Sequence, residues 1–325
     1  MHTQLPLWFE TGSLVVLVLI LVVDLLIILK RPHVPSMKEA GLWVGFYVVL
    51  ALVFAGLLFA LGDSTHGGEF LAGWLTEYSL SIDNLFVFVL LMSKFSVPKK
   101  YQQEVLMVGI IVALICRGAF ILLGSAIIEA FVGVFYLFGL FLLYTAFKQA
   151  FGKEDDENAD DNGIVRFMKK RFRLTDEYDA NKLRTTIDGQ KYFTPMLLVF
   201  IAIGTTDVMF ALDSIPAIFG ITKSPYLVFC TNLFALMGLR QLYFLLGGLL
   251  DALEYLKYGI AAILAFIGVK LILHAGHETW FPWMPDINTW VSLGFIVAAL
   301  GIATIISLIK MKRTHTTVVF GSIDK

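Results

Sequence analysis

Charged side chains are scarce in this sequence. Only 16% of its 325 residues are Asp, Glu, Lys or Arg, whereas a soluble domain carries about a quarter. The formal net charge is -1, which argues against a chain that binds nucleic acid or another polyanion. Hydrophobic residues make up 58% of the chain and the mean hydropathy is +0.79, so the composition indicates a protein embedded in a lipid bilayer.

Cysteine is nearly absent as well. Cys116 and Cys230 both lie in apolar runs, so we expect small core residues and no disulfide framework. The sequence contains no P-loop, which argues against ATP as the energy source in this chain. The apolar runs contain no serine–histidine or paired-histidine constellation. We therefore expect a protein that is not an enzyme and has no cofactor.

Long apolar runs predict an all-α polytopic membrane protein with about nine transmembrane helices. No run alternates strictly enough for a membrane β-barrel. The first run lacks a basic leader and a cleavage site, so we interpret it as a retained span. The predicted spans are residues 12–30, 41–62, 70–93, 104–127, 130–150, 194–221, 225–248, 258–274 and 288–310.

Lysine and arginine predict the orientation of these spans. Apart from Arg117, Arg240, Lys270 and Lys223, they fall in the loops after the first, third, fifth and seventh spans or close to the C-terminus. Positive charge stays inside the cell, so we expect the N-terminus outside and the C-terminus in the cytoplasm. The predicted cytoplasmic loop, residues 151–193, reads as a solvated linker that is partly helical near residues 164–173.

A short acidic motif occurs twice. One copy reads Thr76-Glu77-Tyr78-Ser79-Leu80-Ser81-Ile82-Asp83-Asn84, and the other reads Thr206-Asp207-Val208-Met209-Phe210-Ala211-Leu212-Asp213-Ser214. Arg117 and Arg240 follow in the next spans, and Lys148 and Lys270 end the spans after those. Each matched unit has three spans, so the two repeats would be inserted with opposite topology, as in many transporters.

The repeats divide the chain into five predicted parts. These are an N-terminal two-helix segment (1–69), the first three-helix repeat (70–150), the cytoplasmic loop (151–193), the second three-helix repeat (194–274), and the final helix with its tail (275–325).

Ionisable residues inside the spans form the candidate site. An ionised side chain at the centre of a span costs about 2.5 to 3.5 kcal/mol, so these residues need a purpose. If all of them are ionised, five acids and three bases leave two negative charges, which a divalent cation or two protons would balance. The acids are Asp24, Glu77, Asp83, Asp207 and Asp213, and the bases are Arg117, Arg240 and Lys270, which we expect to pair with acids and to couple their release.

Helix geometry places the two acids of each motif on adjoining stripes of one helix. A local break would bring them to one ion, and Gly204 and Pro216 favour such a break in the sixth span. Asn84 and Asn232 can add amide oxygens. Carboxylate, amide and hydroxyl ligands suit magnesium, calcium or manganese.

Histidine occurs only away from the middle of the spans. His274, His277 and Glu278 end the eighth span, and His66 and Glu69 lie on another predicted outer loop. These residues are either a vestibule that attracts metal or ordinary solvent-exposed loop residues.

Both acidic motifs resemble the signature stretches of the TerC family, and so does Thr231-Asn232-Leu233-Phe234-Ala235-Leu236-Met237-Gly238-Leu239-Arg240. The resemblance covers about residues 12 to 310, and within the family the chain resembles the Alx type of bacterial inner-membrane protein. It implies a nine-span fold related to LysE-type exporters, manganese(II) efflux, a tellurium-resistance label, and secretory or metal-handling membrane partners in some members. The family's acids fall on Asp24, Glu77, Asp83, Asp207 and Asp213, and its asparagines on Asn84 and Asn232. Many members carry Glu where this chain has Gly204, which bears on metal selectivity and proton coupling.

We therefore expect a secondary transporter that exports Mn2+ or a similar divalent cation across the bacterial inner membrane by proton antiport. Asp83 and Asp213 would be the primary ligands, with Glu77, Asp207, Asn84, Asn232 and Asp24 around them. The alternative is a membrane scaffold in a tellurite-resistance or envelope-stress complex, whose interactions would lie on the 151–193 loop.

Overall fold

The computed structural model describes residues 5–30, 35–131, 133–151, 174–175, 178–179, 182–187, 189–246, 256–281, 283–285 and 287–321. Within these ranges, nine helical segments are long and apolar enough to cross a membrane, which confirms the predicted fold class. Eight of them are single helices: α1 (Leu7–Lys30), α2 (Met37–Leu61), α3 (Ser64–Lys94), α4 (Lys99–Ala130), α5 (Val134–Phe151), α7 (Pro195–Phe219), α10 (Leu256–Thr279) and α11 (Thr289–Gly321). The remaining segment consists of two short helices, α8 (Pro225–Leu236) and α9 (Leu239–Leu246).

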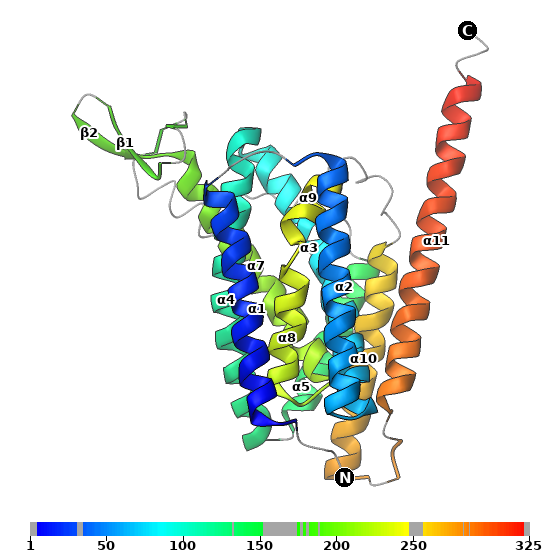
Figure 1. Ribbon diagram of the computed structural model, residues 1–325. Helices are drawn as coiled ribbons and strands as arrows, with labels where there is room; N and C mark the ends of the chain where they lie inside the picture. Colours follow the sequence, from blue (N-terminus) through cyan, green and yellow to red (C-terminus); the bar gives the residue numbers. More distant parts are fainter. Residues whose placement is uncertain are drawn as a thin grey trace.

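The helices form an up-and-down bundle (Figure 1). One end of the bundle carries the connection between α1 and α2, the turn between α3 and α4, and the end of α11. We call it the basic end, because the lysine-rich connections gather there. The other end carries the start of α1 and the turns between α2 and α3 and between α7 and α8, and we call it the opposite end.

Several helices begin at residues that cap them. The Asp63 carboxylate accepts hydrogen bonds from the backbone nitrogens of Thr65 and His66, at 3.0 and 2.9 Å, before the first turn of α3. Ser224 accepts one from Leu227 N before α8, and Pro225 follows it. Such residues satisfy the amide groups that a helix leaves unpaired at its start.

The seventh span is broken in its interior. α8 ends at Leu236, α9 starts at Leu239, and Gly238 between them has a φ of 84°. This left-handed conformation favours glycine. A Cβ atom on Gly238 would also lie 3.1 Å from Cδ2 of Tyr47 on α2.

The break expected in the sixth span is absent from the structure. α7 runs without interruption from Pro195 to Phe219, through both Gly204 and Pro216. Pro216 lies in the last turn of this helix, three residues before its end at Phe219. The amide proton that proline lacks therefore causes no break in the helix. The expectation of a break at Gly204 and Pro216 was therefore wrong.

The connection between α5 and α7 contains a β-hairpin that the sequence interpretation did not include. Strand β1 (Arg184–Ile187) pairs antiparallel with β2 (Gln190–Phe193), and Gly189 in the turn has a φ of 76°. An Asp-Gly pair between two short strands is a strong hairpin signal. The helix expected near residues 164–173 lies outside the described residues.

Burial separates the central helices from the peripheral ones. The seventh span is 83% buried and the window of α3 is 67% buried, whereas α1 and α11 are only 17% buried. α3 packs against α8, α4 against α7, and α5 against α10. The faces on which α3 meets α8 and α4 meets α7 therefore lie in the interior of the bundle.

Candidate ion site in the bundle core

Arg117 lies at the centre of the candidate site. It belongs to α4 and is the largest fully buried side chain of the described residues, with an exposed fraction of 1%. Glu77 on α3, Asp207 on α7 and Asn232 on α8 surround it, with exposed fractions of 0%, 3% and 1%. Four helices thus bring two carboxylates, one amide and one guanidinium together away from water.

The guanidinium contacts all three partners. Nη1 forms an ion pair with Oε1 of Glu77 and donates a 2.8 Å hydrogen bond to Oδ1 of Asn232. Nη2 lies 3.6 Å from Oδ1 of Asp207. Two carboxylates facing one guanidinium leave one negative charge if all three groups are ionised. The second oxygens, Oε2 of Glu77 and Oδ2 of Asp207, are buried without a hydrogen-bond partner in the described structure.

Two buried serine hydroxyls flank this cluster. Ser81 follows Glu77 by one turn of α3, and Ser214 follows Asp207 by about two turns of α7. Both are 1% exposed, and neither Oγ has a hydrogen-bond partner in the described structure. α3 and α7 run in opposite directions, so Ser81 lies toward the basic end and Ser214 toward the opposite end. Buried polar atoms normally have partners, so a polar ligand or water would satisfy these hydroxyls.

The remaining predicted ligands of the two motifs are placed only in part. Asn84 on α3 is 7% exposed. Asp83 and Asp213 occupy positions in α3 and α7, but their side chains lie outside what the structure describes. Among the described side chains, no group of three or more His, Cys, Asp or Glu residues is close enough to hold a metal ion. Any metal ligation by Asp83 and Asp213 stays a prediction.

Comparison with known proteins gives the family. The family model described as "Integral membrane protein TerC family" matches residues 62–315, most of the chain. The chain is a member of the TerC family. It is 39% identical over 305 residues to the "Putative membrane-bound redox modulator Alx" of Salmonella typhi, covering 91% of this chain and 92% of that protein. It is 40% identical over 271 residues to the protein of the same name from Escherichia coli K12, covering 81% and 84%.

Another relative has no described activity. It is the "Uncharacterized membrane protein Mb2742" of Mycobacterium bovis, 43% identical over 278 residues, which are 84% of this chain and 70% of that protein. No solved structure matches the chain.

A second ion pair of this TerC-family protein lies nearer the basic end. Arg240 on α9 places Nη2 3.3 Å from Oδ1 of Asp24 on α1. The Tyr47 side chain on α2 lies close to Asp24. The Arg240 and Asp24 side chains are 12% and 15% exposed, so the pair is partly buried. It is separate from the Arg117 cluster, and sequence reasoning missed Tyr47, which no motif marks.

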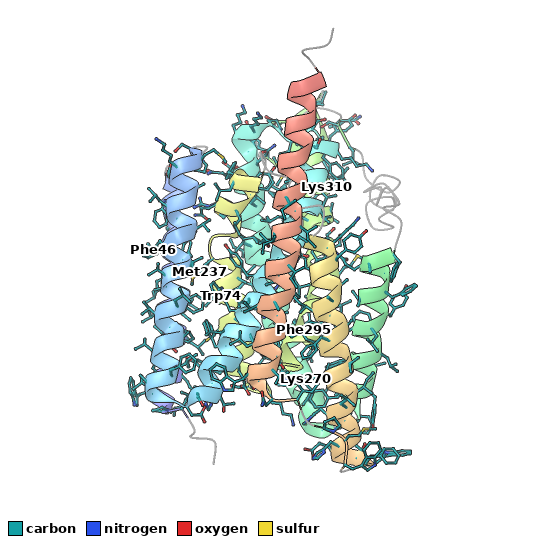
Figure 2. All side chains as sticks on the ribbon, turned by 90° about the vertical axis from the view of Figure 1, so that its right-hand side faces the viewer. Phe46, Trp74, Met237, Lys270, Phe295 and Lys310 are labelled. Atoms are coloured by element: carbon teal, nitrogen blue, oxygen red, sulfur yellow. The ribbon has the colours of Figure 1, made fainter. Side chains whose placement is uncertain are left out.

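The third predicted base, Lys270, lies toward the opposite end (Figure 2). It is 8% exposed and donates a 3.1 Å hydrogen bond from Nζ to Oγ of Ser292 on α11. It lines a cavity of about 570 Å3 with His66, Glu69, Thr222, Lys223 and His274. Glu69 accepts a 2.5 Å hydrogen bond from Thr222, and His66 bonds Asp63 at 2.7 Å. Of the residues predicted as a vestibule, His66, Glu69 and His274 thus line one cavity. His277 instead forms a hydrogen bond with the Met284 carbonyl oxygen.

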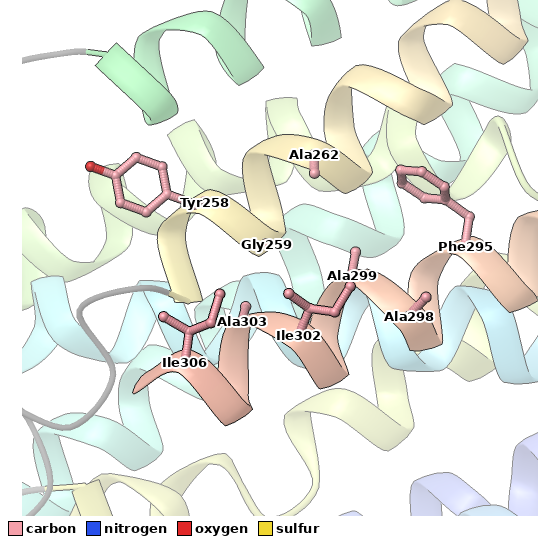
Figure 3. Close-up of a pocket in the computed structure, with 9 residues that line it drawn as sticks. All are labelled: Tyr258, Gly259, Ala262, Phe295, Ala298, Ala299, Ile302, Ala303 and Ile306. Atoms are coloured by element: carbon pink, nitrogen blue, oxygen red, sulfur yellow. The ribbon is translucent and has the colours of Figure 1, made fainter. Parts of the chain in front are cut away.

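A second cavity is apolar. It has a volume of about 510 Å3 and lies between α10 and α11, beside the point where Gly259 packs closely against Ala299 and Ala303 (Figure 3). Its described lining has no carboxylate or imidazole group, and exposed lining residues such as Ile302 suit contact with lipid.

Proposed function

We propose that this TerC-family protein is a secondary transporter that exports a divalent metal cation, first of all Mn2+, in exchange for protons. One observation carries the proposal. Glu77 and Asp207, the matched acids of the two motifs, converge with Asn232 on Arg117 in the fully buried interior of the bundle. Intramembrane ionisable residues that face the bundle interior mark ion pathways.

The charge of the cluster supports exchange of cations. Arg117 supplies the positive charge that Glu77 and Asp207 face. A metal ion that binds these carboxylates must displace the guanidinium. Protons that bind the carboxylates remove their negative charge and so weaken the binding of the metal ion. Metal and protons thus compete for the same oxygens, which is the requirement for antiport. Oxygen ligands of this kind favour manganese, magnesium or calcium.

The broken seventh span supports an ion site beside Asn232. A helix leaves its last carbonyl oxygens without intrahelical partners, and its C-terminal end carries partial negative charge. Asn232 lies four residues before the end of α8 at Leu236. In transporters, unwound carbonyls and helix C-terminal ends near the middle of the membrane coordinate cations.

Helix pairing supports the inverted repeats. If α3, α4 and α5 are matched with the sixth, seventh and eighth spans, exchanging the two units turns the α3–α8 contact into the α7–α4 contact. The α5–α10 contact maps onto itself. These are the helix pairs that pack together in the core. We include in the proposal an approximate two-fold axis within the membrane plane, on which the Arg117 cluster would lie.

The surrounding system is part of the same proposal. The protein would sit in a bacterial inner membrane with its basic end in the cytoplasm, because lysine and arginine are retained there. Its ligands would be a divalent cation, protons and the lipid bilayer, with secretory or metal-handling membrane proteins as further partners. It would be a carrier without enzymatic activity.

The relatives' name raises a redox role. A dithiol mechanism in this chain would need Cys116 and Cys230, the only two cysteines. Both are free thiols, and Cys230 is fully buried on α8. This arrangement gives a dithiol mechanism no support, so the proposal rests on the carboxylates.

Manganese efflux tests the proposal. Cells without their own manganese exporters would express the wild type, Glu77→Gln, Asp207→Asn, or the control Asp179→Asn, which removes a carboxylate from the linker. At matched membrane levels, the wild type and the control should lower total manganese and speed radiolabelled efflux. In the two core variants, manganese efflux should be slower than in the wild type by at least about 10- to 100-fold. Loss of a group that supports a metal site typically has an effect of this size on metal affinity or activity.

Other outcomes point elsewhere. A wild type that leaves manganese unchanged contradicts export of this ion. The membrane scaffold would be favoured if deletion of residues 152–173 abolishes the function of the protein in these cells while both core variants keep that function.

A further inference from the structure

The short helix α9 forms the half of the seventh span nearer the basic end. It has eight residues and follows α8 through Met237 and Gly238. Asn232 lies on the other side of this break, in the Arg117 cluster. Figure 1 shows α9 above α8, between that core and the basic end. α9 therefore lies on the side from which a cytoplasmic ion would approach.

Three contacts hold α9 and the break in place. Arg240 of α9 pairs with Asp24 of α1 at 3.3 Å. Tyr47 of α2 packs on Gly238, since a Cβ atom there would lie 3.1 Å from its ring. Tyr243 of α9 adds a 3.1 Å hydrogen bond to Gln102 of α4. Asp24 is the residue that joins α1 to α9.

The helix α8 is attached to α1 independently. Ser13 of α1 and Tyr226 of α8 form a hydrogen bond of 2.6 Å. Ser13 and Asp24 are eleven positions apart, or about 16 Å along a helix. α1 thus bonds the broken span once on each side of the break. Loss of the Asp24 contact would loosen α9, which then keeps only its contacts with Tyr47 and Gln102, while α8 stays attached to α1.

An ion can reach the core only if something moves, because Glu77, Arg117, Asp207 and Asn232 are at most 3% exposed. α9 has the features of a movable element. It is short, it is joined through a glycine with positive φ, and its Gln241 is buried with neither amide atom hydrogen-bonded in the described structure. An unsatisfied buried amide disfavours the closed packing.

We propose that Asp24 is a positioning residue that latches α9 over the core site through Arg240. Release of the Asp24–Arg240 pair lets α9 pivot at Met237–Gly238 and opens the Arg117 cluster to the cytoplasm. The latch rests on the proposed function for its purpose, because it controls access of the exported cation. Asp24 acts through α9 and does not bind the metal.

Hydrogen exchange tests the latch without any transport measurement. The purified full-length protein would be compared with Asp24→Asn, with the swapped pair Asp24→Arg/Arg240→Asp, and with the control Ser13→Ala. Asp24→Asn should speed exchange of residues 239–246 about tenfold, which corresponds to about 1.4 kcal/mol, and leave residues 225–232 unchanged. The swapped pair should restore slow exchange, and Ser13→Ala should leave α9 unchanged.

Two results would overturn the latch. One is unchanged exchange of α9 in Asp24→Asn. The other is an equal increase in α8 and α9, because that means general loosening of the bundle. A failure of the swapped pair to restore protection, at wild-type yield, would count equally against it.

A cross-link connects the latch to transport. A cleavable thiol reagent would join Asp24→Cys to Arg240→Cys, with each single variant as control for reaction at Cys116 or Cys230. Cross-linking should stop manganese efflux and cleavage should restore it. If the wild type itself moves no manganese, the proposed function fails while the exchange result still decides the latch. If the wild type exports manganese and the cross-linked chain does so equally, the latch is wrong.

Discussion

Arg117 donates a hydrogen bond of 2.8 Å from Nη1 to Oδ1 of Asn232, a residue 115 positions away in the sequence. The amide of Asn232 is oriented by a second bond, because its Nδ2 donates to the Val228 carbonyl oxygen at 2.9 Å. Its oxygen therefore faces the core cluster and its nitrogen faces its own helix. Any cation that replaces the guanidinium finds this oxygen already directed toward it, which costs less ordering than a free side chain.

Removal of Arg117 should destabilise the protein. Arg117→Ala leaves Glu77 and Asp207 buried without a counter-charge, which typically costs about 3 to 5 kcal/mol. We expect a clearly lower thermal unfolding temperature of the purified protein. The triple variant Arg117→Ala/Glu77→Gln/Asp207→Asn should recover most of the loss while remaining unable to transport. Equal stability of Arg117→Ala and the wild type would show that the ion pairs contribute little.

The two flanking serines should behave differently from Arg117. Ser81→Ala and Ser214→Ala remove buried hydroxyls that have no partner in the described structure, and burying such a group without a bond costs about 1 to 3 kcal/mol. Each variant should therefore unfold at the wild-type temperature or above it. If the hydroxyls contact the passing ion, efflux should slow nevertheless. Ser125→Ala is the control, because its hydroxyl bonds the Leu122 carbonyl oxygen near the surface. A loss of stability in Ser81→Ala would reveal a structural partner.

The linker should show an acid-sensitive contact. Hydrogen bonds from Thr185 and Lys182 lower the pKa of Asp179 below its ordinary value of 3.8. A depressed folded-state pKa means that the contact stabilises the linker above the unfolded pKa and is lost as pH falls through the folded pKa. Pepsin cleavage between residues 182 and 193 should therefore increase below about pH 3.8. Asp179→Asn should lack this step, and an identical pH profile in both proteins would contradict the assignment.

Much of the architecture could be predicted because a membrane restricts the choices. Apolar run length and the need for internal hydrogen bonds are enough to find the nine spans. The same reasoning singled out Glu77, Asp207, Asn232 and Arg117, because polar groups in a span are costly and need partners. Their meeting on one guanidinium depends on helix packing, which span-by-span reasoning does not contain.

The location of the break shows where sequence reasoning is insufficient. Proline and glycine in the sixth span suggested a break there, yet proline near the end of a helix is tolerated. Gly238 gave a weaker sequence signal, but its backbone is left-handed and Tyr47 occupies the space where a side chain would be. That neighbour comes from another helix, so no local pattern announces it. The hairpin was missed for a different reason, since its Asp-Gly turn lies in a segment judged by its charge alone.

Substitution of Gly238 should disturb the break directly. In Gly238→Ala the new Cβ would meet the Tyr47 ring at 3.1 Å, and an L-residue in the left-handed region costs about 1 to 2 kcal/mol. We expect a lower unfolding temperature and faster hydrogen exchange in residues 239–246. Gly259→Ala is not a suitable control, because Ala303 lies against it; Gly294→Ala on the lipid-facing helix α11 is, since nothing lies within 4 Å.

A second substitution separates the two costs at Gly238. Gly238→Asn adds a Cβ that meets Tyr47 in the same way, but asparagine tolerates the left-handed conformation better than alanine. If backbone strain dominates, Gly238→Asn should unfold at a higher temperature than Gly238→Ala. If the contact with Tyr47 dominates, the bulkier asparagine should be the worse of the two, and Tyr47→Ala should rescue both. Wild-type stability in Gly238→Ala would mean that the chain at Met237–Gly238 readily adopts another conformation, and the hinge would then have to be sought elsewhere in the seventh span.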